Sequence, residues 1–133
     1  MADGPRFEVV LIPAGPTAWD LAGRLAGKTD LPLAPEGLQA ASAVTTALQG
    51  LRPTGLICGQ EEAPRVFAEG VARGLGLKAK GHEGLAAMDL GLWEGMTKAQ
   101  LLDRCPRVCK SMQTDPETIV PPNGDVLIGQ AGP

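Results

Sequence analysis

The sequence predicts an α/β fold with a mostly parallel sheet, built as one domain over residues 1–133. Three observations lead to this class: two apolar runs with β-branched residues, a segment of helical apolar spacing between them, and a second such segment after them. Strand, crossover helix, strand and helix in this order form the chain pattern of a parallel sheet covered by helices. A chain of 133 residues, of which 44% are hydrophobic, is long enough to build one core.

The strands are expected where the chain is most apolar. Residues 7–12 form the longer run, which is typical of a buried parallel strand, and residues 55–58 form a shorter one. Between them a helix is expected to begin at Pro35, which suits a first helical turn, and to end before Gly50 and Pro53. Its apolar face consists of Leu38, Ala41, Val44, Thr45 and Leu48.

A second helix is expected over residues 62–75, with Gly76 just past its end. Its apolar face consists of Val66, Phe67, Val71 and Leu75. Residues 116–133 are rich in proline and glycine, so an irregular tail is expected there.

Charge and composition exclude several classes of partner. The net charge is −3 and no run of Lys and Arg occurs, so nucleic acid is not an expected partner. No apolar stretch approaches the length of a bilayer span, and residues 1–6 lack the features of a signal peptide. We therefore expect a soluble, cytoplasmic protein that does not bind membranes.

The cysteines and the histidine do not indicate a metal site. Cys105 and Cys109 lie on the stripe of a predicted buried helix face, which also contains Leu101, Val108 and Met112. The spacing of the three cysteines in the chain fits no zinc motif, and His82 has no neighbouring ligands. We therefore expect neither a metal nor any other cofactor.

Three segments carry a recognisable pattern. Residues 9–20 read Val-Val-Leu-Ile-Pro-Ala-Gly-Pro-Thr-Ala-Trp-Asp. Residues 23–40 contain Gly-Arg, Asp-Leu-Pro-Leu and Pro-Glu-Gly-Leu-Gln-Ala, and residues 88–97 contain Asp-Leu-Gly-Leu-Trp-Glu-Gly. In their order and spacing these segments resemble the motifs of the histidine phosphatase (phosphoglycerate mutase-like) superfamily, over about the first two thirds of a typical member. The resemblance implies a three-layer α/β/α sandwich with a mostly parallel sheet, C-terminally truncated.

The same resemblance shows which catalytic groups this chain lacks. In the family a histidine attacks phosphorus, arginines and a second histidine bind the phosphoryl oxygens, and a carboxylic acid protonates the leaving group. Here the nucleophile position is Ala14 and the preceding arginine position is Pro13. The second arginine falls on Ala63 and the acid on Ala87, while the second histidine belongs to a later strand that the sequence does not contain. The resemblance therefore predicts no catalytic residues.

A residual phosphate site is the remaining candidate. Gly15, Thr17 and Arg24 match motif positions near the family pocket, and Gly15 with the amide of Thr17 could contribute to a weak anion nest. The structural roles are the favoured interpretation: Gly15 could only permit a tight turn, and Trp93, another motif residue, could only fill the core. Pro16 opposes a nest because it has no amide hydrogen.

Three functions follow from these observations. The leading hypothesis is a catalytically inactive pseudoenzyme that acts as a protein-interaction or structural subunit. The alternatives are a phosphate- or phosphoester-binding sensor, and a phosphatase that uses a nucleophile foreign to the family, for which Cys58 is the candidate.

The partner expected under the leading hypothesis is another protein chain. In the resembled family the strand that carries the second histidine lies beside the first strand. Without it, residues 9–12 are expected to leave an unpaired apolar edge, and such edges are normally covered. We expect an identical chain, giving a homo-oligomer, or a full-length relative to cover it.

Overall fold

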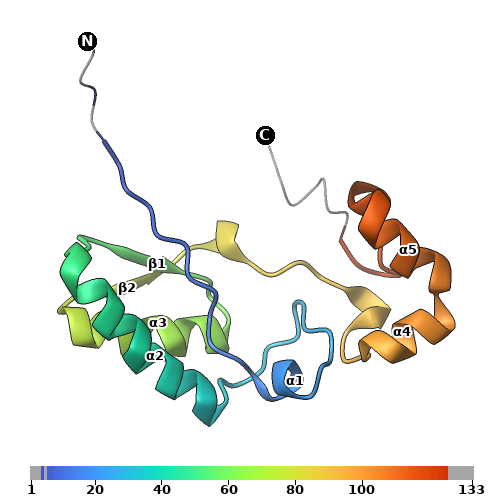
Figure 1. Ribbon diagram of the computed structural model, residues 1–133, viewed down its shortest axis with the longest axis horizontal. Coiled ribbons are helices and arrows are strands. Elements are labelled where there is room, and N and C mark those ends of the chain that lie inside the picture. The colour runs from blue at the N-terminus through green and yellow to red at the C-terminus, as the bar shows by residue number, and fades with distance from the viewer. Residues whose placement is uncertain (1–3, 5, 126–133) are drawn as a thin grey trace.

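The computed structural model describes residue 4 and residues 6–125 of the chain. Its helices and strands run in the order α1 (Ala18–Leu21), α2 (Pro35–Leu48), β1 (Leu56–Cys58), α3 (Glu62–Leu75), β2 (Ala79–Gly81), α4 (Lys98–Arg104) and α5 (Pro106–Thr114). Single 3-10 turns occupy Gln49–Leu51, Glu83–Leu85, Gly91–Trp93 and Pro116–Thr118. Figure 1 shows a larger body made of α2, α3 and the two strands, a smaller lobe made of α4 and α5, and α1 between them.

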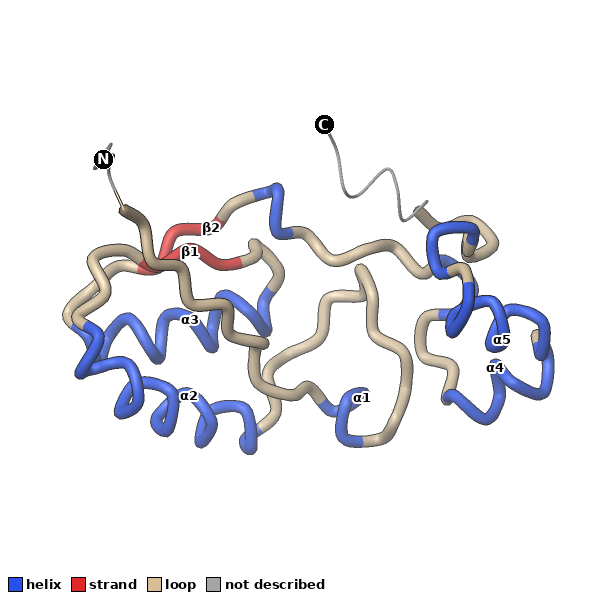
Figure 2. Tube along the Cα trace, turned by 45° about the horizontal axis from the view of Figure 1, so that its top comes forward, coloured by secondary structure: helices blue, strands red, loops and turns tan. Residues whose placement is uncertain are grey.

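The sheet is a parallel pair, which confirms the predicted α/β class. Leu56 of β1 lies opposite Ala79 of β2, and Cys58 lies opposite Gly81. The connecting helix α3 packs against one face of this pair, as Figure 2 shows. Because side chains alternate along a strand, Cys58 is buried while Ile57 is 64% exposed. An apolar side chain therefore lies on the open face of the sheet.

The core of the body lies between α2 and α3. It is formed by the buried residues Ala41 and Leu48 of α2 and Phe67 and Val71 of α3. The two helices approach closely where Gly74 meets Thr45, because a Cβ atom at position 74 would overlap the Thr45 side chain.

The helices of the body begin and end as predicted. α2 begins at Pro35, and Ala34 precedes it as an N-cap residue whose side chain makes no capping hydrogen bond. α3 ends before Gly76, which has a φ of 68° and closes the helix in the left-handed conformation that glycine adopts without strain. Helical spacing together with proline and glycine therefore predicted both helices correctly.

The strand predicted for residues 7–12 does not form, so this prediction is wrong. Figure 1 shows the amino-terminal part of the segment rising away from the body. Its apolar side chains are exposed, from 38% at Ile12 to 89% at Leu11. A buried parallel strand needs hydrogen-bonding partners along its edges and helices over its faces, and no segment within residues 6–125 supplies them.

The single buried helix face expected around the cysteines is also wrong. Pro106 cannot continue a helix from the preceding turn, so α4 ends at Arg104 and α5 starts at Pro106 itself. Leu101 is buried, but Cys105 and Cys109 are only partly buried and Met112 is exposed. The stripe is therefore divided between two short helices of the lobe.

The chain after α5 is irregular but anchored. After the turn Pro116–Thr118, residues 119–125 contain neither helix nor strand. The amide of Asp89 donates to Oδ2 of Asp125 at 2.9 Å, and the amide of Asp125 donates to the Asp89 carbonyl at 2.8 Å. The rest of the predicted irregular tail, residues 126–133, lies outside the described residues.

Candidate functional site

The segment that contains the nucleophile position lies against α3. Ala14 is exposed, whereas the next residue, Gly15, is buried. A Cβ atom on Gly15 would lie 2.6 Å from Cα of Gly37 and 3.0 Å from Cδ2 of Phe67. Gly15 does not have a positive φ, and glycine is needed here because a side chain would meet the Gly37 backbone.

The other two vacant catalytic positions meet at the start of α3. Ala63 is a buried residue in the first turn of that helix. The amide of Ala87 donates to Oε1 of Glu61, the N-cap residue of α3, at 3.0 Å. Phe67, which contacts the Gly15 position, lies one turn after Ala63 on the same helix. The segments that contain Ala14, Ala63 and Ala87 therefore lie close together, but the methyl side chains of these residues have no catalytic group.

Backbone amides in this region are bonded to carboxylates of the chain itself. The amide and the hydroxyl of Thr17 donate to Oδ2 of Asp20 at 2.8 and 3.0 Å, within a capping box at the start of α1. The amide of Glu62, the first residue of α3, donates to Oδ1 of Asp30 at 2.8 Å. A helix N-terminus is where phosphate is normally received. At α3 that position is taken by Asp30.

Arg24 and Thr29 stabilise the loop between α1 and α2. Arg24 Nη1 donates to the Gly95 carbonyl at 2.6 Å, and its backbone forms an antiparallel bridge with Thr97. The amide of Thr29 donates to Oε1 of Glu94 at 2.6 Å. Trp93, next to Glu94, is buried, in agreement with the structural alternative for this residue. Each of the predicted phosphate-binding residues thus makes a structural contact. Gly15 packs against the Gly37 backbone, Thr17 caps α1, and Arg24 stabilises the loop between α1 and α2.

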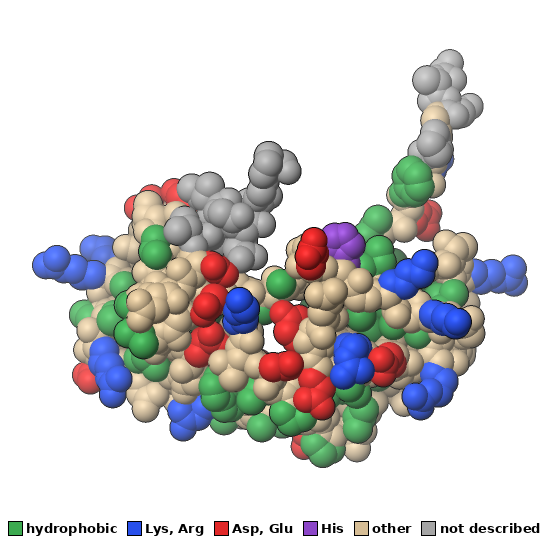
Figure 3. Space-filling model, turned by 180° about the vertical axis from the view of Figure 1, so that it is seen from behind, with side chains coloured by type: hydrophobic (Ala, Val, Ile, Leu, Met, Phe, Trp, Pro, Cys, Tyr) green, Lys and Arg blue, Asp and Glu red, His purple; other side chains and the backbone are tan. Residues whose placement is uncertain are grey.

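The electrostatic character of this region is acidic. Hydrogen bonds bring carboxylates of Asp30, Glu61 and Glu94 to segments that lie next to one another. Figure 3 shows several acidic side chains around a hollow in the middle of one face, with basic side chains beside them. A phosphate group beside these carboxylates would be repelled by their negative charge.

Cys58, the alternative nucleophile, is buried at the end of β1. Burial raises the pKa of its thiol, the negative charge of Glu69 raises it further, and Arg65 partly offsets both effects. Because the thiolate is the reactive form, these surroundings are opposite to those of an activated cysteine. Arg65 is itself engaged with Glu69 at 3.2 Å.

No metal site appears in the part of the chain that the structure describes, where no three His, Cys, Asp or Glu side chains are grouped to hold an ion. His82 Nδ1 accepts a hydrogen bond from the amide of Gly84 at 2.9 Å. Likewise, none of the helices in the described ranges is long and apolar enough to cross a membrane.

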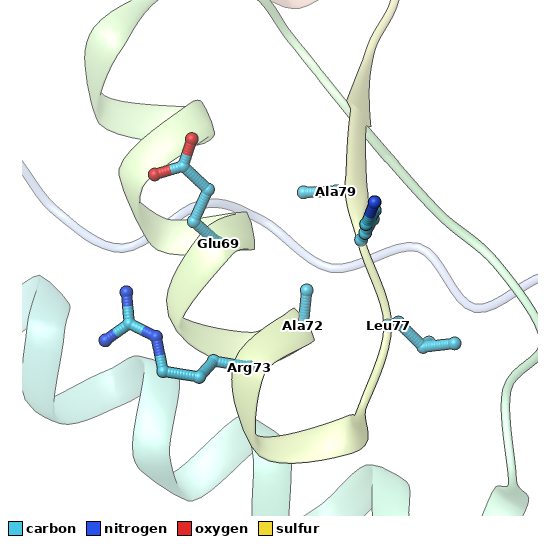
Figure 4. Close-up of a pocket in the computed structure, with 6 residues that line it drawn as sticks. Glu69, Ala72, Arg73, Leu77 and Ala79 are labelled. Carbon is cyan, nitrogen blue, oxygen red and sulfur yellow. The ribbon is translucent and has the colours of Figure 1, made fainter.

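A hollow of about 410 Å³ lies elsewhere, between α3 and β2. In Figure 4, Ala72 and Ala79 point into it, whereas the charged ends of Glu69 and Arg73 point away. Its lining includes none of the predicted site residues, and its polar groups do not converge. It is therefore not a candidate active site.

The functional residues that sequence reasoning missed are the carboxylates of Asp20, Asp30 and Glu61. A signal for Asp20 was present, because Thr-x-x-Asp ahead of a helix is close to the capping-box pattern. No local signal indicates the other two, because Asp30 and Glu61 bond to residues 32 and 26 positions away in the sequence.

Solved structures show the same fold. A mycobacterial glucosyl-3-phosphoglycerate phosphatase determined with VO3 has a TM-score of 0.81 at 24% identity, covering 89% of this chain and 56% of that one. Bacillus stearothermophilus YhfR has a TM-score of 0.77 at 24% identity, covering 88% and 58%. The protein TTHB049 from Thermus thermophilus has a TM-score of 0.71 at 27% identity, covering 90% and 64%. The chain thus spans somewhat more than half the length of these proteins.

No curated protein matches the chain. The sequence pattern of the histidine phosphatase superfamily (branch 1), however, matches residues 9–129, which is most of the chain. This match includes each of the three segments that carried the resemblance, and the shared fold agrees with it. The chain belongs to the histidine phosphatase superfamily.

Proposed function

We propose that this chain is a catalytically inactive member of its superfamily that acts as a protein-interaction or structural subunit. The substitutions Ala14, Ala63 and Ala87 support the loss of chemistry, because a methyl group can neither attack phosphorus nor bind or protonate its oxygens. Losing one member of a catalytic unit can lower the rate by on the order of a million-fold, and further losses add little.

The observation that carries the proposal is the capture of anion-binding amides by internal carboxylates. The first amide of α3 is bonded to Asp30, and the Thr17 amide is bonded to Asp20. A phosphate ion would have to displace these groups or lie beside them. Two like unit charges 4 Å apart repel by about 1 kcal/mol in water and by about 4 kcal/mol near a protein surface.

The same contacts also separate the leading function from its alternatives. A phosphoester sensor would need free donors in the pocket, whereas the Thr17 amide and hydroxyl and Nη1 of Arg24 donate to groups within the chain. A cysteine phosphatase would need a thiol of lowered pKa, whereas burial raises the pKa of Cys58. The interaction role is the one that requires no chemistry at the pocket.

Turnover and binding measurements test the proposal. Purified protein should not hydrolyse p-nitrophenyl phosphate above the buffer rate, and calorimetry with inorganic phosphate at millimolar concentration should show no saturable heat. Ala14→His should not restore turnover, because Pro13 and Ala63 leave the phosphoryl charge without arginines. The proposal would be overturned if the protein hydrolysed the substrate and a single substitution in this chain abolished that turnover. A saturable heat of phosphate binding would favour the sensor.

Cellular context forms the remaining part of the proposal. Cys58, Cys105 and Cys109 are all free thiols. Free thiols are usual in a reducing compartment, which supports a cytoplasmic setting. The partner we propose is another polypeptide, either a second copy of this chain or a different protein.

A further inference from the structure

Residues 6–12 carry apolar side chains that the described chain does not cover. Phe7, Val9 and Leu11 are 84%, 76% and 89% exposed, whereas Val10 and Ile12 are 54% and 38% exposed. This alternation is that of an extended chain with one face turned fully to solvent. Within residues 6–125, the main chain of residues 6–14 forms no hydrogen bond. Its amides and carbonyls are therefore available to pair with another strand.

The apolar residues on one face of this segment are arranged symmetrically about Val9. Phe7 and Leu11 lie two positions to either side of Val9, on the same face of an extended chain. Pro5 and Pro13 lie four positions to either side and delimit the segment. A segment with this arrangement is complementary to a second copy of itself turned by 180°, which is the requirement for a twofold interface.

We propose that a second copy of this chain covers the segment, by antiparallel pairing of residues 6–12 about a twofold axis at Val9. This inference rests on the proposed function and deepens it, because it names the partner and the surface. In this register Val9 lies opposite the second copy's Val9, and Phe7 lies opposite the second copy's Leu11. The apolar side chains of both copies then share one face.

Neighbouring registers are excluded by charge and by proline. Pairing about Glu8 would place two carboxylates directly opposite each other, which destabilises a strand pair. Pairing about Val10 would bring Pro13 opposite Phe7, inside the ladder, where proline cannot donate a hydrogen bond. Pairing about Val9 keeps Pro13 outside the paired residues and separates the two Glu8 side chains.

Sedimentation velocity over a range of about 1 to 100 micromolar protein tests this interface. The wild-type chain should show a reversible dimer. Val9→Lys should weaken the dimer by at least about tenfold in dissociation constant, since it replaces central apolar contacts by two facing charges. Leu102→Lys is the matched control: Leu102 is an exposed apolar residue of α4, and its replacement should leave the dimer unchanged.

Disulfide formation tests the register. Val9→Cys should cross-link to its own copy under mild oxidation, because opposed residues have Cα atoms within the range that a disulfide spans. Val10→Cys should not, because the two Val10 positions would be about 8 Å apart, beyond that range. The wild-type chain, oxidised in parallel, gives the background from its own cysteines.

Several results would overturn this inference. In sedimentation, these are a monomer at all concentrations, or a dimer that Leu102→Lys weakens and Val9→Lys does not. In the oxidation experiment, it is cross-linking at position 10 but not at position 9. Association only with a different polypeptide would also overturn it. Each is independent of the catalytic test. An inactive monomer overturns the pairing alone, whereas an active dimer overturns the proposed function alone.

Discussion

Phe7 and Phe67 are the two phenylalanines of the chain, and their surroundings are opposite. Phe67 is 6% exposed in the body, where α2 and α3 pack together. Phe7 is 84% exposed on the segment before position 14. Both regions are apolar in sequence, but only the region of Phe67, in α3, finds a helical partner close by in the chain, which is α2. Apolar composition therefore predicts that a segment must be covered, whereas topology decides what covers it.

Replacing each phenylalanine by alanine should give the largest difference in stability between the two regions. Phe67→Ala should lower the free energy of unfolding by about 3 to 5 kcal/mol, because it removes the largest side chain of the core. Phe7→Ala should change it by less than about 0.5 kcal/mol in the monomer. Urea denaturation of both variants at submicromolar concentration measures the difference. Equal losses would mean that residues 7–12 are buried in the folded monomer.

A second test concerns how the segment enters the body. Gly15→Ala should cost about 1 to 3 kcal/mol, because the new methyl group would meet the backbone of Gly37, which cannot move away as a side chain can. Gly50→Ala is the matched control, since nothing lies within 4 Å of the position that its Cβ atom would take. Thermal unfolding of the two variants compares them. A Gly15→Ala protein as stable as the control would contradict the close approach.

The start of α2 offers a smaller, stabilising change. Ala34 is the N-cap residue and provides no side-chain acceptor for the Glu36 amide. The neighbouring positions need none, since Pro35 has no amide hydrogen and the Gly37 amide donates to the Ala34 carbonyl. Ala34→Ser should raise the free energy of unfolding by about 1 kcal/mol, and serine is small enough for this buried position. Ala47→Ser, on the exposed side of the same helix, controls for the serine itself. An unchanged denaturation midpoint for Ala34→Ser would mean that the new hydroxyl does not cap the helix.

The smallest expected effect is a pH dependence at Cys58. Folding raises the pKa of this thiol, so the unfolded chain loses its proton at a lower pH than the folded chain. Its contribution to stability is complete below the ordinary thiol pKa of about 8.5 and is lost as pH rises above it. Stability measured from about pH 7.5 to 10 should fall less steeply for Cys58→Ala than for the wild type. Identical slopes would contradict the assignment.

Local patterns predicted the parts of the fold that depend on neighbours in sequence. Helical spacing with Pro35 and Gly76 gave the bounds of α2 and α3 correctly. β2 reads Ala-Lys-Gly, which has no strand pattern, and it forms because it pairs beside β1. The wrong strand at residues 7–12 has the opposite cause, a strand pattern that finds no partner among residues 6–125.

The candidate site likewise has features that local sequence predicts and features that it does not. The vacant catalytic positions were readable from the motifs around Ala14 and Ala87. The hydrogen bond between the first amide of α3 and Asp30 was not, because Asp30 reaches α3 across a long separation in sequence. Only the folded chain brings such groups together, so contacts of this kind cannot be predicted from local sequence.

Hydrogen exchange tests most directly the central claim that residues 6–12 are an uncovered segment that pairs with a second copy. At submicromolar concentration the amides of residues 7–12 should exchange at the rate of an unstructured chain, while those of α3 stay protected. Protection of residues 7–12 should appear as the concentration is raised and should be absent in Val9→Lys. Protection of this segment at every concentration, in both proteins, would contradict the account.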